Sequence, residues 1–163
     1  MIGMGMHELS ALLWRERELL EALHFKLEVE QLLLAAGKTR WLSRATQETE
    51  QVTARLKEVG LARTVEATAV AAEWGAPEDA TLRQLSAASP DTVWTDILDS
   101  HFAGLASVVS RIEAVRDENV RLLRAMNRDA QETLATLEPF PIAYDAQGAA
   151  SSRSDARIVD REA

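Results

Sequence analysis

The stretch that decides the fold is residues 91–138, DTVWTDILDSHFAGLASVVSRIEAVRDENVRLLRAMNRDAQETLATLE. It contains no proline and a single glycine, Gly104. A set of mostly apolar residues recurs in it at alternating steps of four and three, which places them on one face of a long helix. These residues are Trp94, Leu98, His101, Leu105, Val108, Ile112, Val115, Asn119, Leu122 and Met126.

An apolar stripe of this length is not stable when it is exposed to water. Burial of one Leu, Val or Ile side chain contributes roughly 1.5–3 kcal/mol. The stripe must therefore pack against other helices of the chain, against a second copy, or against a partner protein. The choice among these three decides most of the function.

Composition excludes several classes of protein. The chain has 163 residues, which suits one domain, and 47% of them are hydrophobic, mainly Leu, Ala and Val. A formal net charge of −8 argues against nucleic-acid binding, because phosphate contacts need a basic patch. The chain has no cysteine, so it has no disulfide, no thiolate metal site and no cysteine nucleophile.

The N-terminal residues have no basic region and no long apolar run. We therefore expect no signal peptide, no transmembrane span and no membrane insertion. The expected location is the cytoplasm.

Apolar residues at helical spacing predict four helices. Their approximate limits are residues 6–36, 39–73, 81–88 and 92–137. We therefore expect an all-α fold, an elongated antiparallel helical bundle or coiled-coil-like hairpin of three long helices plus one short helix. The bundle domain would span residues 1–138.

Glycines and a threonine mark the helix ends. Gly37 fits a C-terminal cap, a tight turn, or a glycine within a longer helix. Gly60 lies inside the second helix, costs about 1 kcal/mol relative to Ala, and permits a bend or break there. The run Gly75-Ala76-Pro77 ends that helix, and Thr81 is placed to cap the short one.

The character of the chain changes after Leu137. Pro139, Pro141 and Gly148 break any helix, and the last fifteen or so residues are small and polar with alternating charge. Residues 139–163 are therefore predicted to be a flexible, disordered C-terminal tail.

Residues that could carry chemistry are scarce. Glu21 and His24 form one E-x-x-H motif, but a di-iron bundle needs a second, and Leu98 stands three residues before His101. No serine has a neighbouring His-and-carboxylate pattern, and no Gly-rich phosphate loop is present. We expect no enzyme activity, no catalytic residue, no metal site and no cofactor.

Two polar residues lie on the apolar stripe. His101 is expected to be buried with one hydrogen-bond partner, and a pH-sensitive contact is the other interpretation. Asn119 either fixes the register or oligomeric state of the helices, or marks where the bundle opens to water.

The run from His7 to Leu23, HELSALLWRERELLEAL, resembles the first helix of FlgN-family flagellar export chaperones. Residues 26–28 and 30–42 continue the resemblance, as do residues 144–148 and 157–160 in the tail. The resemblance covers nearly the whole chain and rests on a helix pattern.

This resemblance implies a cytoplasmic chaperone of the flagellar type III export system. Such a protein binds the C-terminal amphipathic helices of hook-associated (hook–filament junction) proteins, prevents their premature aggregation, and delivers them to the flagellar export apparatus. Client binding in the family is attributed to the C-terminal part of the chaperone, which here is the long helix. The client-binding residues expected on this basis are Val108, Ile112, Val115, Leu122, Leu123, Met126, Leu134 and Leu137.

Release of the client at the export gate favours moderate affinity, and we expect Gly104 and Asn119 to weaken the packing of the long helix. The alternative is a structural, self-associating helical bundle or coiled coil, such as a homodimer, without an export role.

Overall fold

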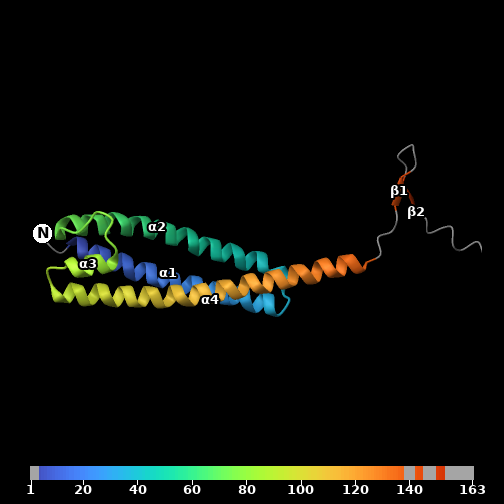
Figure 1. Ribbon diagram of the computed structural model, residues 1–163, viewed down its shortest axis with the longest axis horizontal. Coiled ribbons are helices and arrows are strands. Elements are labelled where there is room, and N and C mark those ends of the chain that lie inside the picture. Colours follow the sequence, from blue (N-terminus) through green and yellow to red (C-terminus); the bar gives the residue numbers. More distant parts are fainter. Residues whose placement is uncertain (1–3, 138–141, 145–149, 153–163) are drawn as a thin grey trace, which may run out of the picture. The chain divides into compact units, whose positions relative to one another are not determined.

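The computed structural model describes residues 4–137, 142–144 and 150–152 (Figure 1). The helices in these ranges are α1 (Met4–Ala35), the 3-10 helix η1 (Thr39–Trp41), α2 (Leu42–Trp74), α3 (Leu82–Ala88) and α4 (Thr92–Thr136). The chain divides into two compact units, Met1–Arg124 and Ala125–Ala163. The predicted all-α helical bundle is confirmed.

The predicted tail, residues 139–163, lies mostly outside the described residues. Its described parts are two short strands, β1 (Ile142–Tyr144) and β2 (Ala150–Ser152), which pair antiparallel. This pairing was not predicted, because neither three-residue segment is long enough to show an alternating apolar pattern.

Within the first unit, α1 lies between α2 and α4 (Figure 1). α2 runs antiparallel to α1, since Arg63 late in α2 pairs with Glu16 of α1, whereas Glu48 early in α2 pairs with Lys26 later in α1. Small buried residues of α2, such as Ala45 and Ala71, allow the two backbones to approach closely.

α4 runs parallel to α1, because their contacting residues rise in number together. Ser10 contacts His101 near one end, and Leu27 contacts Asn119 further along. The sequential order of the helices is therefore up, down and up, with α3 in the connection between α2 and α4.

The hydrophobic core is concentrated at the end of the first unit where α3 lies. The core cluster takes residues from all four helices, and each member is at most 2% exposed. Its members are Met6, Leu9, Leu13, Val70, Ala71, Leu85 and Leu98. Beyond this cluster the buried residues of α4 are few, namely His101, Val108 and Asn119.

Helix ends follow the expected chemistry. Gly37 and Gly75 adopt φ values of +66° and +69°, the left-handed conformation that ends α1 and α2. Thr81 caps α3 in a reciprocal capping box, in which the Gln84 N–H donates to Thr81 Oγ1 and the Thr81 N–H donates to Gln84 Oε1. Gly60 lies inside α2, which continues through it without the break that the sequence permitted.

Two glycine substitutions test this description of α2 in opposite directions. Gly60→Ala should raise the free energy of unfolding by roughly 1 kcal/mol, because the helix gains propensity and no atom lies within 4 Å of the added Cβ. Gly75→Ala should lower it by about 1 kcal/mol, because Gly75 has a φ of +69°. Urea unfolding followed by circular dichroism measures both. A destabilised Gly60→Ala variant would show that α2 is not continuous there.

Candidate functional site

The predicted client-binding residues differ widely in exposure. In the first unit, Val108 is fully buried and Leu123 is 42% exposed. Between them, Ile112, Val115 and Leu122 are partly buried. Val108 can therefore reach a client only if α4 separates from the helices that cover it.

The remaining three predicted residues lie in the second unit. Met126 is partly buried, while Leu134 and Leu137 are 68% and 62% exposed. Both leucines are thus available for contact without any change in the fold. Large exposed apolar side chains near the end of a helix are candidates for a partner contact.

His101 is one of the buried polar groups between α1 and α4. It is 3% exposed, its Nε2 lies 3.0 Å from Ser10 Oγ, and the Trp14 ring meets it edge-on with 5.3 Å between centroids. Burial lowers the pKa of His101, and the Arg17 charge lowers it further. The predicted buried histidine with a hydrogen-bond partner is confirmed.

Gly104 provides a second contact between these helices. A Cβ on Gly104 would lie 2.6 Å from Arg17 Nη1, so the guanidinium occupies the space that any larger residue would fill. The central carbon of the Arg17 guanidinium lies 5.6 Å from the centroid of the Trp14 ring. Gly104 therefore admits a cation from α1, whereas we expected it only to weaken the packing.

Asn119 connects the same two helices further along. Its side chain is buried, and Nδ2 donates a 3.0 Å hydrogen bond to the Leu27 carbonyl oxygen. Its Oδ1 is buried without a hydrogen-bond partner among the described residues. This contact supports a role in setting the register of α4 on α1, rather than an opening of the bundle to water.

The E-x-x-H motif is engaged in ion pairs. Arg111 donates two hydrogen bonds to the Glu21 carboxylate, at 2.7 and 3.2 Å, and lowers the pKa of Glu21. His24 Nε2 lies 3.5 Å from Glu28 Oε1. Across the described ranges, no three side chains of the metal-ligating types gather.

A concave apolar surface lies at the N-terminal end of α3. It encloses about 290 Å³ and is open to solvent. Its lining comes from all four helices: Glu16 and Leu20 of α1, Arg63 of α2, Leu82 of α3, and Phe102, Leu105, Ala106 and Val109 of α4. We call this surface the α3-end groove.

Three charged groups lie in or beside the α3-end groove. Arg63 Nε lies 2.7 Å from Glu16 Oε2, which explains how a glutamate is accommodated on the apolar face of α1. The Arg83 guanidinium lies 4.3 Å from the centroid of the Phe102 ring. The three charged residues Glu16, Arg63 and Arg83 were not predicted as site residues, because the sequence does not show which flank of α4 faces α2 and α3.

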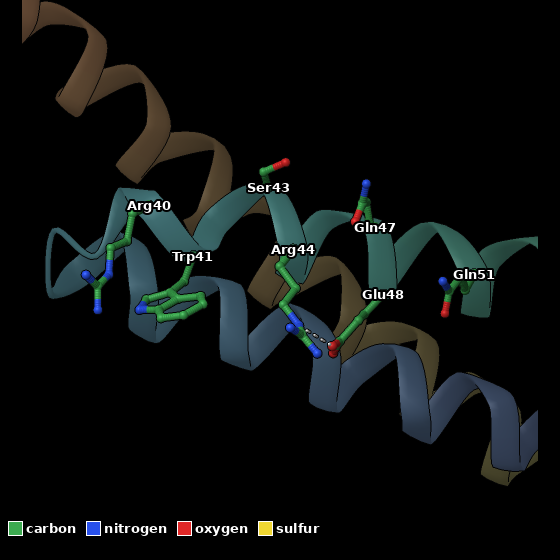
Figure 2. Close-up of a pocket in the computed structure, with 7 residues that line it drawn as sticks. All are labelled: Arg40, Trp41, Ser43, Arg44, Gln47, Glu48 and Gln51. Atoms are coloured by element: carbon green, nitrogen blue, oxygen red, sulfur yellow. Dashed lines mark ion pairs between the residues drawn. The ribbon is translucent and has the colours of Figure 1, made fainter.

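A second concave surface is polar and belongs to η1 and the beginning of α2. It encloses about 550 Å³ and is lined by Arg40, Trp41, Ser43, Arg44, Gln47, Glu48 and Gln51 (Figure 2). Figure 2 shows Arg44 and Glu48 pointing toward one another, with 3.6 Å between Nε and Oε1. Glu48 also accepts a 2.7 Å hydrogen bond from Lys26, which is the main cause of its lowered pKa. This surface does not offer an apolar face to a helix.

The environment of His101 predicts a pH dependence of stability. The unfolded chain has a histidine pKa near 6.5, and the folded value is lower, so the unfolded state binds more protons as the pH falls. The free energy of unfolding should therefore decrease as the pH falls from about 7.5 to about 5.5, with a slope of at most about 1.4 kcal/mol per pH unit. His101→Gln should flatten this slope in urea unfolding.

Exposed His7 provides the matched control, because His7→Gln should keep the wild-type slope. The pH range from about 7.5 to about 5.5 lies above the range in which carboxylates titrate, so carboxylates do not contribute to the slope. An equal slope in the wild type and in His101→Gln would contradict the account of His101.

Comparison with known proteins identifies the family. The family model described as FlgN protein matches residues 1–152. No curated protein and no solved structure matches the chain. Among the described residues, none of the helices combines the length and the hydropathy that a membrane span requires. Because the family model covers residues 1–152, the chain belongs to the FlgN family of flagellar export chaperones.

Proposed function

We propose that this protein is a cytoplasmic chaperone that binds the C-terminal amphipathic helix of hook-associated (hook–filament junction) proteins. It keeps that helix from aggregating prematurely and delivers the client to the flagellar export apparatus. Family membership supports the general chaperone role in export. The observation that carries the specific proposal is the exposure of Leu134 and Leu137, at 68% and 62%. The function needs neither a catalytic residue nor a cofactor.

The exposed leucines belong to a helical face. Met126, Ala130 and Leu134 recur at steps of four on one side of the last turns of α4, and Leu137 follows directly after the helix ends at Thr136. A helix face of this kind accepts the i, i+3/i+4, i+7 face of another amphipathic helix. Covering the client helix removes the exposed apolar surface through which it would aggregate.

The two groups of predicted residues have different roles in this proposal. Met126, Leu134 and Leu137 make the first contact, because exposed side chains need no rearrangement. In the first unit, buried Val108 contributes only after α4 loosens, while partly buried Ile112, Val115 and Leu122, with exposed Leu123, are separate candidate contacts.

The size of the first contact is consistent with a reversible complex. Burial of two leucines contributes roughly 3–6 kcal/mol, whereas micromolar binding corresponds to about 8 kcal/mol. The leucines therefore supply a large part of a moderate affinity and not a permanent interface. A client held in this way can dissociate at the export apparatus.

The same leucines support a second candidate, a self-associating bundle or homodimer without a client. Size-exclusion chromatography with light scattering distinguishes the two. For a chaperone, the mass of the species changes when the hook-associated protein is added. For a purely self-associating bundle, the mass is already that of an oligomer and the addition leaves it unchanged.

A pair of charge substitutions tests the assigned face. Leu134→Glu with Leu137→Glu should weaken binding of a hook-associated protein at least tenfold, because carboxylates replace the apolar contact. The free energy of unfolding should change by less than about 0.5 kcal/mol, since both leucines are exposed. Isothermal titration calorimetry measures the affinity.

The matched control is Ala135→Glu with Thr136→Glu, which adds the same two charges at exposed positions away from the leucine face. The control should bind as tightly as the wild type. Equal affinities of the leucine double variant and the control would reject the assigned face. Repeating the titration without residues 139–163 determines whether the tail is also needed.

A further inference from the structure

Five residues make a polar contact between α1 and α4 just beyond the core cluster. On α1, Ser10, Trp14 and Arg17 recur at steps of four and three, so they share one face of the helix. On α4, His101 and Gly104 lie one turn apart and meet that face, His101 against Ser10 and Trp14 and Gly104 against Arg17. We call these five residues the His101 cluster.

The His101 cluster lies between two differently packed parts of α4. Leu98, three residues before His101, belongs to the core cluster. Val108, one turn after Gly104, is fully buried but does not belong to the core cluster, and the next buried residue of α4 is Asn119. Separation of α4 from α1 at the His101 cluster would therefore uncover Val108 and leave the core cluster intact.

The His101 ring has a thin cover. The Trp14 ring that meets it edge-on is itself 55% exposed, and the other named contact is the hydroxyl of Ser10. The Arg17 guanidinium fills the space above Gly104 and does not bury an apolar side chain there. A small movement of α4 is therefore enough to bring water to the imidazole.

Protonation of His101 would place a second positive charge beside Arg17, in a contact that is closed to water. The other charged or titratable groups around the cluster are engaged elsewhere: Asp99 with Ser86, Glu18 with Arg15, Glu21 with Arg111, Glu16 with Arg63, Arg83 over Phe102 and His7 against Trp94. Hydration of the imidazolium and the guanidinium requires α4 to move away from α1. Protonation therefore favours the separated state.

We propose that the His101 cluster is a proton-sensitive latch, in which protonation of His101 releases the part of α4 between Gly104 and Arg124 from α1 and makes Val108 accessible to the client helix. The contribution of Val108 to client binding rests on the proposed function. The opening itself is a property of the free chain and is measured without a client.

Linkage limits the size of the effect. A histidine exposed to water has a pKa near 6.5, so a fall from pH 7.5 to pH 5.5 increases the ratio of opened to closed protein by at most about tenfold. Burial, and then the Arg17 charge, lowers the pKa of His101 in the closed state. We therefore expect an increase of about threefold to tenfold.

The absence of cysteine from the chain permits a direct measurement of the opening. In Val108→Cys, the single thiol reacts with a thiol reagent only when α4 separates from the helices that cover it. Dividing its rate by that of the same variant unfolded in urea cancels the pH dependence of the thiol itself. This relative rate should rise about threefold to tenfold from pH 7.5 to pH 5.5. No rise would overturn the latch.

The matched control is Val70→Cys, which places the thiol in the core cluster at a valine that is 1% exposed. Its relative rate should be at least tenfold lower than that of Val108→Cys at both pH values, because the core cluster stays closed when the latch opens. Equal rates would show that the whole first unit opens together, which also overturns the latch.

Further substitutions in Val108→Cys test the named contacts. His101→Gln should abolish the rise on acidification, and His7→Gln should keep it. Gly104→Ala places a Cβ 2.6 Å from Arg17 Nη1 and displaces the guanidinium. It should increase the relative rate at pH 7.5 about threefold, and Arg17→Gln should add little to that increase, because both substitutions remove the same contact. Fully additive effects would reject the Arg17 contact as part of the latch.

Calorimetry with the hook-associated protein tests the consequence for client binding. The ratio of the Kd of His101→Gln to that of the wild type cancels the titration of the client. This ratio should be close to one at pH 7.5 and at least three at pH 5.5, because only the wild type populates the opened state more at the lower pH.

The outcomes separate this inference from the proposed function. If the thiol at position 108 becomes more reactive on acidification but the ratio of Kd values stays constant, the latch does not regulate client binding and the chaperone function stands. If the client binds the wild type at neither pH, the proposed function fails, and the thiol reaction alone decides whether the latch exists.

Discussion

The packing of Leu9 and Leu13 against Leu85 and Leu98 is the contact on which the rest of the first unit depends. It joins α1 to α3 and to the start of α4, and Val70 and Ala71 bring α2 into the same cluster. Fully buried leucines each contribute roughly 1.5–3 kcal/mol, so a large share of the stability lies at this one end. The remaining length of the long helices is free to present apolar surface elsewhere.

Beyond that cluster, polar contacts hold α4 on α1. Exposed ion pairs such as Glu21–Arg111 contribute little to the stability, because water screens them. The buried hydrogen bonds of His101 and Asn119 matter more for register, since a shift of α4 would leave polar groups unpaired in the interior. An arrangement of this kind has one defined register, and we propose that it lets α4 loosen for the binding and release of a client helix.

Helical periodicity predicted the elements of this fold well, and the caps at Gly75 and Thr81 followed from local chemistry. The α3-end groove could not be predicted in the same way. Whether Val109 faces solvent, α2 or α1 depends on where α2 and α3 lie, and no local pattern contains that information. The contact between Gly104 and Arg17 was not predicted for the same reason, because it joins residues far apart in the chain.

The central claim is that the core end is firm while the later part of α4 is held loosely and kept available for a partner helix. Native-state hydrogen exchange, followed by mass spectrometry, measures this directly. In the free protein, amides of residues 105–137 should exchange faster than those of residues 9–34, and a bound hook-associated protein should slow them. Equal protection of both segments in the free protein, with no change on adding the client, would contradict the account.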